Sequence, residues 1–152
     1  MDLYCEHPSG KRQRGSVMVE FALLLPLLVS LFLGTWQFGY AYYLYGELEQ
    51  AVRDGGRYAS LRSYDAANPS IFQTAVQNVV VYGNPAGGTQ RVVPGLLLSN
   101  VTVTISFAGG GQPKVTVSIS GYQLPAMFSK IVLNGKPGNQ FPFLGNWAPL
   151  PL

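Results

Sequence analysis

The sequence has few of the side chains that carry out chemistry. Among its 152 residues there is one cysteine, Cys5, and one histidine, His7. A single cysteine cannot form an intramolecular disulfide, and a lone histidine near the N-terminus leaves no Ser–His or Cys–His pair in the rest of the chain. A metal site needs a cluster of ligating side chains, yet the acidic residues after Glu20 are only Glu47, Glu49, Asp54 and Asp65. We therefore expect no catalytic residue, no metal site, no cofactor and no enzyme activity.

Charge is also scarce. Charged residues make up 11% of the chain and the formal net charge is +3. The only basic cluster is Lys11, Arg12 and Arg14, too little for a nucleic-acid surface, and no pattern indicates a small-molecule substrate. The length allows one domain in addition to a membrane segment.

A long uncharged run dominates the N-terminal third. No residue from Phe21 to Gly46 is charged and most are apolar, whereas a bilayer core of roughly 30 Å needs about 20 such residues in a helix. We therefore predict a transmembrane helix over residues 16–46. Pro26 lies inside it and would kink or loosen the helix locally. Aromatic residues typical of a membrane interface crowd its second half: Trp36, Tyr40, Tyr42, Tyr43 and Tyr45.

The charges that flank this run predict its direction. Lys11, Arg12 and Arg14 precede it, and the first charges after it are Glu47 and Glu49. The positive-inside rule then places the N-terminus in the cytoplasm and residues 47–152 outside it. An ordinary cleaved signal peptide is the less favoured alternative, because the run is too long for its apolar region.

One carboxylate, Glu20, lies at the edge of this run. An ionised group in lipid costs on the order of a few kcal/mol, so we expect Glu20 to have a partner or to reach water. Position alone leaves two alternatives open: Glu20 reaches back to the cytoplasmic headgroups, or it pairs with a cation in another subunit.

The residues around Glu20 resemble a known pattern. Gly15 after a basic leader, with Glu20 and Phe21 following, is similar to a type IV prepilin leader. More narrowly, Val19–Leu28 resembles the opening of the TadE-like family, the minor pilins or pseudopilins of the tight adherence (Flp, type IVc) pilus system. The resemblance continues to Ala59 and covers about residues 15–60, although Tyr40 stands where many members have a basic residue.

The resemblance implies a processing site and an assembly role. Residues 1–15 would be a leader that a prepilin peptidase removes between Gly15 and Ser16, and Phe21 belongs to the same motif. The Glu20 carboxylate would then face the new amine of a neighbouring subunit, an ion pair that fixes register more than it adds affinity, since desolvation offsets much of its attraction. Implied partners are the peptidase, other pilus subunits, assembly-platform proteins and membrane lipid.

The resemblance also implies a location, the bacterial inner (cytoplasmic) membrane or the pilus itself. Two alternatives stay open within this function, since the protein could enter the fibre or remain in the membrane as an initiator. The rival function is a single-pass membrane-anchored extracytoplasmic binding module that takes no part in a filament.

Residues 47–152 predict a small α+β domain, which the resemblance implies is pilin-like. The first helix should continue, with Gly55-Gly56 favouring a bend or fraying, and one apolar face made of Leu48, Ala51, Val52, Gly55, Tyr58 and Ala59. Asn68-Pro69 is typical of a helix start. The amphipathic helix that follows should end near Tyr82-Gly83 and cover a sheet.

The alternation of apolar and polar residues predicts that sheet. Val101–Phe107 and Val115–Ser120 read as two strands of a β-hairpin. Two strands alone are marginal, so we expect Arg91–Leu98 to add a third. For the tail 121–152 we expect partial packing against the sheet, with an exposed apolar end.

Overall fold

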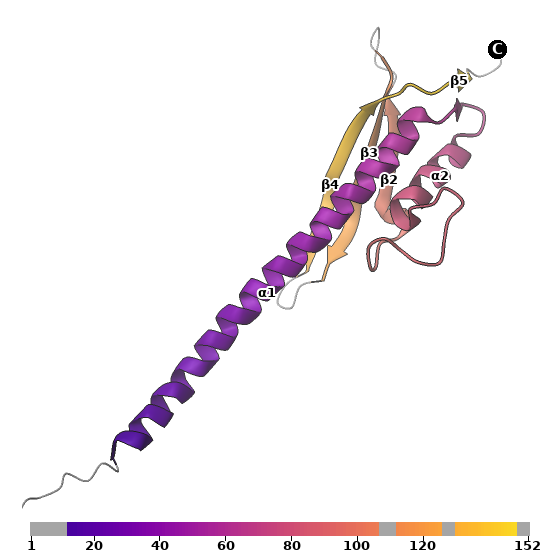
Figure 1. Ribbon diagram of the computed structural model, residues 1–152. Helices are drawn as coiled ribbons and strands as arrows, with labels where there is room; N and C mark the ends of the chain where they lie inside the picture. Colours follow the sequence, from indigo (N-terminus) through magenta and orange to yellow (C-terminus); the bar gives the residue numbers. More distant parts are fainter. Residues whose placement is uncertain (1–11, 107–111, 126–129, 149–152) are drawn as a thin grey trace, which may run out of the picture. The chain divides into compact units, whose positions relative to one another are not determined.

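The computed structural model describes residues 12–106, 112–125 and 130–148. The chain divides into two compact units, residues 1–39 and residues 40–152, which are considered separately. Helix α1 (Arg12–Leu61) begins in the first unit and ends in the second (Figure 1).

In the first unit, α1 exposes nearly all of its apolar side chains. Met18 is 74% exposed, Leu23 74% and Phe32 67%. The helix continues through Pro26, whose carbonyl accepts a hydrogen bond from Ser30 Oγ at 2.7 Å. A helix that is apolar on all sides needs an apolar environment. Whether Pro26 kinks the helix stays a prediction.

The second unit is α+β, as predicted. Its helical elements after α1 are α2 (Pro69–Tyr82) and the short 3-10 helix η1 (Leu98–Asn100). Strands β2, β3 and β4 form one antiparallel sheet in that order, and β1 pairs with β5 in parallel. The strands are β1 (Tyr64–Asp65), β2 (Val101–Ser106), β3 (Lys114–Leu124), β4 (Ile131–Pro142) and β5 (Trp147–Ala148).

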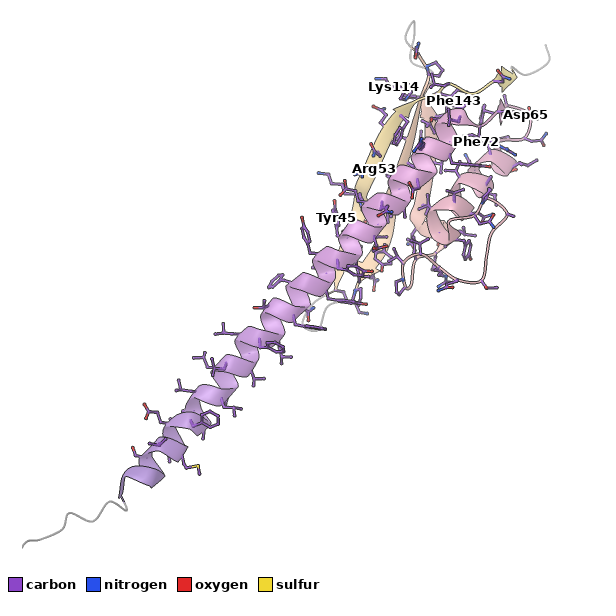
Figure 2. The ribbon with its side chains drawn as sticks, in the orientation of Figure 1. Tyr45, Arg53, Asp65, Phe72, Lys114 and Phe143 are labelled. Carbon is purple, nitrogen blue, oxygen red and sulfur yellow. The ribbon has the colours of Figure 1, made fainter. Side chains whose placement is uncertain are left out.

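One core joins α1, α2 and the sheet (Figure 2). The predicted apolar face of α1 is confirmed, because Leu48, Val52 and Ala59 are each at most 1% exposed. The face begins earlier than expected, at Leu44, which is also buried. The sheet is therefore covered by α1 as well as by the amphipathic helix that was expected to cover it.

The predicted bend or fraying at Gly55-Gly56 is wrong. Helix α1 continues to Leu61, and both glycines are buried. A Cβ at Gly55 would overlap Val80 Cγ2 of α2, and a Cβ at Gly56 would lie 2.5 Å from the Phe141 ring of β4. The absence of side chains thus lets two neighbours approach α1 closely, and their packing offsets the low helix propensity of glycine.

Helix α2 has the predicted bounds. Pro69 is at its start, and Gly83 ends it in the left-handed conformation (φ 70°), where its N–H donates to Val79 O. Asn68 holds the N-cap position, but its side chain makes no cap hydrogen bond and donates instead to Asp65 Oδ2 at 3.3 Å. Ile71, expected on the apolar face, is 70% exposed.

The predicted hairpin is confirmed as β2 and β3. The prediction of a third strand at Arg91–Leu98 is wrong, because residues 91–97 form a loop that buries Val93 and Leu96. The tail supplies the third strand instead, since β4 pairs with β3 along most of its length. Irregular pairing near Gly121 (φ 74°) interrupts the alternation along β3 and hides the long strand pattern in the sequence.

Candidate processing and assembly site

The predicted cleavage site lies in the first turns of α1. The helix begins at Arg12, and Gly15 and Ser16 follow within it. Glycine lowers helix propensity by about 1 kcal/mol relative to alanine, so Gly15 weakens the helix locally at the Gly15–Ser16 bond. A Cβ at Gly15 would meet nothing within 4 Å.

Glu20 lies one helical turn beyond Ser16 on the same side of the helix. Its side chain is exposed and makes no hydrogen bond or ion pair with any group in the described part of the chain. Phe21 beside it is 60% exposed. The carboxylate is thus available to a group from outside this chain, about 6 Å along the helix axis from Ser16.

Only two of the three basic residues of the predicted leader lie among the residues that the structure describes. Lys11 lies outside the described residues, as does the rest of the leader before it. Arg12 and Arg14 form the start of α1. Their role in orientation stays a prediction.

The apolar part of α1 has the length of a bilayer core. From Phe21 to Gly39, the last residue of the first unit, a helix rises about 28 Å, close to the roughly 30 Å thickness of the hydrocarbon. Among the described residues, α1 is the one helix long and apolar enough to cross a membrane. The helix is therefore compatible with a single-pass membrane anchor.

The second unit offers little chemistry in its described residues. No group of three or more His, Cys, Asp or Glu side chains comes together in them. Asp65 lines a shallow hollow of about 360 Å³ beside the start of α2, but its carboxylate accepts hydrogen bonds from Ala67 N at 2.9 Å and from Asn68. Asp65 thereby shapes the turn between β1 and α2.

One feature at the end of the expected span was not predicted from the sequence. The buried Leu44 belongs to the second unit, which begins at Tyr40, so this unit includes the last residues of that span. The signal was present, because Leu44, Leu48 and Ala51 are spaced at i, i+4 and i+7, as on one helix face.

These features define a class of protein, in which one N-terminal apolar helix suited to anchor the chain in a membrane carries a small α+β domain. Residues 15–57 match the family model described as TadE-like protein. The resemblance found in the sequence is thereby confirmed, and this segment of the chain is TadE-like. The match associates the protein with a tight adherence pilus system and suggests interaction with other components of that system. No curated protein and no solved structure gives a significant match.

Proposed function

We propose that this protein is a minor pilin or pseudopilin that takes part in assembly of a tight adherence (Flp, type IVc) pilus. A prepilin peptidase removes residues 1–15 at the cytoplasmic face, and α1 stays in the inner membrane with the second unit outside the cytoplasm. The work of the protein is assembly, through contacts with other pilus subunits and with the assembly platform, and not catalysis.

The observation that carries this proposal is the TadE-like match, which begins at Gly15 and includes Glu20 and Phe21. The geometry of α1 supports it. The proposed cleavage would leave Ser16, a favoured N-terminal residue, at the new helix end.

The new Ser16 amine would add a positive charge to the positive end of the helix dipole. A carboxylate from a neighbouring subunit is attracted to that end, and Glu20 is an exposed carboxylate near the same depth. Because the pair forms at the edge of the hydrocarbon, its attraction is stronger than in water, and an unpaired Glu20 would be costly there.

Mass spectrometry after co-expression with a prepilin peptidase tests the cleavage. We expect loss of residues 1–15 from the wild-type chain and an intact N-terminus for Gly15→Leu. Gly34→Leu is the matched control, since a Cβ at Gly34 also meets nothing within 4 Å in the same helix. An intact wild-type N-terminus beside a peptidase that cuts its own pilin would refute the processing step.

Glu20→Gln tests the assembly role, because it removes the charge and keeps the shape. We expect normal cleavage and membrane insertion, with few or no pili on the cell surface. Glu47→Gln changes a carboxylate of the second unit in the same way and should leave piliation unchanged. Normal piliation in the Glu20 variant would favour a role of Glu20 at the headgroups, and normal piliation after deletion of the whole protein would favour the membrane-anchored binding module.

A further inference from the structure

The outer side of β2 is an open strand edge of the sheet. β2 forms one side of the three-stranded sheet (Figure 1), and β3 is its only partner among the described strands. In an antiparallel ladder each residue directs its N–H and its C=O to the same side, and successive residues alternate between the two sides. The residues of β2 that do not bond to β3 therefore direct their backbone groups outward.

Two hydrogen bonds identify these outward residues. Phe143 N donates to Pro113 O at 2.7 Å, so Pro113 at the start of β3 faces β4. Alternation along β3, together with the register of β2 and β3, then directs the odd-numbered residues of β2 outward. Gln77 Nε2 of α2 donates to Val101 O at 3.0 Å, and this contact agrees with an outward Val101.

Val103 and Ile105 leave four backbone groups open at this edge. Both outward groups of Val101 are used, because its N–H donates to Leu98 O and its C=O accepts from Gln77. The N–H and C=O groups of Val103 and Ile105 have no hydrogen-bond partner on the outer side within the described chain. Groups at every second residue are the pattern to which an added strand bonds.

The edge of β2 lacks the protection that the opposite edge of the sheet has. β2 has six residues, none of them charged or proline, and its register with β3 has no shift. β4 carries Lys136 and Pro137 and pairs irregularly with β3. The Gln140 N–H of β4 also donates to Asn139 Oδ1 at 3.1 Å. Because proteins commonly block free edges with charge, proline or bulges, the unblocked edge of β2 suits a strand that acquires a partner.

The side chains along β2 define the chemistry of that partner. Val103 and Ile105 lie on the core face and are only partly buried, whereas Val117 beside them on β3 is fully buried. Thr104, between them, is exposed on the outer face. An added strand would therefore place apolar side chains beside Val103 and Ile105 and uncharged polar ones beside Thr104.

We propose that the outer edge of β2 binds an extended segment of another component of the pilus system, which joins the sheet as a further strand. The inference rests on the proposed function, and the TadE-like match suggests interaction with such components. The bound segment has apolar residues at alternate positions and, over the paired stretch, neither charge nor proline. Its backbone hydrogen bonds supply affinity, and its alternating side chains supply specificity.

A second copy of this chain is the other occupant that the hydrogen-bonding pattern admits. β2 of one copy could pair with β2 of another in the antiparallel direction, with Thr104 opposite Thr104 at the centre. Such an interface uses the same surface on both copies and closes on itself, whereas an open filament grows through contacts between different surfaces. A role in filament assembly therefore favours a different chain at this edge.

Photo-crosslinking in cells that carry the whole pilus system tests the contact. The full chain carries one photoreactive residue, in place of Thr104 beside the open edge or in place of Gln140 on β4, and both side chains are exposed. We expect position 104 to crosslink to another pilus component, within a segment of alternating apolar residues, and position 140 not to do so. A crosslink from position 104 to a second copy, or no crosslink in piliated cells, would overturn the proposal.

Proline substitution tests whether assembly needs the open edge. Val103→Pro removes an outward N–H that the fold does not use, and proline is tolerated at such edge positions. We expect it to abolish the crosslink from position 104 and to reduce piliation to the level of a strain that lacks the protein. Gln140→Pro, the matched change at the opposite edge, should leave both unchanged.

The outcomes separate this edge from the proposed function. Normal piliation with Val103→Pro, in a system that loses its pili when the whole protein is deleted, would overturn the edge contact and leave the function standing. Normal piliation after the deletion would instead contradict the function itself. The crosslink from position 104 is measured in a chain with Val103 intact, so it decides the proposal even if Val103→Pro fails to fold.

Discussion

Replacing Gly55 by alanine tests whether packing outweighs helix propensity at this position, because the two effects change the free energy of unfolding in opposite directions. In a helix exposed to solvent this change stabilises by up to about 1 kcal/mol. At Gly55, however, the new Cβ would overlap Val80 Cγ2, and Val80 is fully buried. Overpacking of this kind costs about 1–3 kcal/mol, so we expect Gly55→Ala to leave the free energy of unfolding up to about 2 kcal/mol lower.

Gly46→Ala is the matched control, because Gly46 lies in the same helix and unit and a Cβ there meets nothing within 4 Å. We expect it to be neutral or stabilising by up to about 1 kcal/mol. Val80→Ala removes the methyl group that the new Cβ at position 55 would meet. The double variant should therefore be less destabilised than the sum of the single variants, by about 1 kcal/mol.

Urea unfolding of the full chain in detergent micelles, followed by circular dichroism and tyrosine fluorescence, gives these free energies. The reasoning fails if Gly55→Ala stabilises the protein as Gly46→Ala does. It also fails if the changes at Gly55 and Val80 are additive, because the predicted overlap is a pairwise contact and must appear as a coupling.

Two further predictions concern the second unit. The Tyr122 hydroxyl donates a hydrogen bond to Pro94 O at 2.8 Å, and burial followed by the nearby Tyr40 raises its pKa in the folded state. The folded protein then holds this proton more tightly than the unfolded chain. The stabilisation is complete below the unfolded pKa of about 10 and is lost as pH rises through the folded pKa, by at most about 1.4 kcal/mol per pH unit. In urea titrations between neutral and alkaline pH, the free energy of unfolding of Tyr122→Phe should decline less steeply than that of the wild type, and an equal slope would contradict the raised pKa of Tyr122. Gly145→Ala would push a Cβ into the backbone carbonyl of Arg62, and backbone cannot move aside as the tip of a side chain can. Gly135 is the comparison, because it has open space around it but a positive φ. We expect Gly145→Ala to lower the urea midpoint of unfolding more than Gly135→Ser does.

The sequence predicted those elements whose patterns are local. The face of α1 that includes Leu48 and Val52 follows from a spacing of three and four residues. Helix α2 has a proline at its start and Gly83 at its end, and β2 alternates strictly between valine or isoleucine and polar residues. Each signal is contained within one element, so no tertiary information was needed to read it.

The elements that sequence reasoning missed depend on tertiary contacts. β4 contains Gly135, Lys136, Pro137 and Gly138, residues that are depleted in strands. It forms because its edge position and its irregular pairing with β3 tolerate them. The Gly55-Gly56 pair was misread for a related reason, since its favourable contacts come from Val80 and Phe141, far away in sequence.

The candidate site stays a prediction, and it could be proposed from the sequence for a different reason. Gly15, Ser16, Glu20 and Phe21 have no described tertiary neighbours to contradict or reinforce them, so the motif itself carries the information. The structure adds that these side chains are exposed and that Glu20 lacks a partner among the described groups.

The surface pattern of α1 indicates where its environment changes. Before Tyr40 the helix is apolar on every side, with Trp36 and Phe38 exposed at 68% and 77%. From Leu44 onward one face is buried in the core and the other carries charges such as Glu49 and Arg53, which form an exposed ion pair at 2.9 Å. Charge alone would end the membrane span at Gly46, but a side chain packed in the core of the second unit cannot also face lipid. Packing therefore favours an end of the span near Tyr40, and a span from Phe21 to Gly39 matches the hydrocarbon thickness.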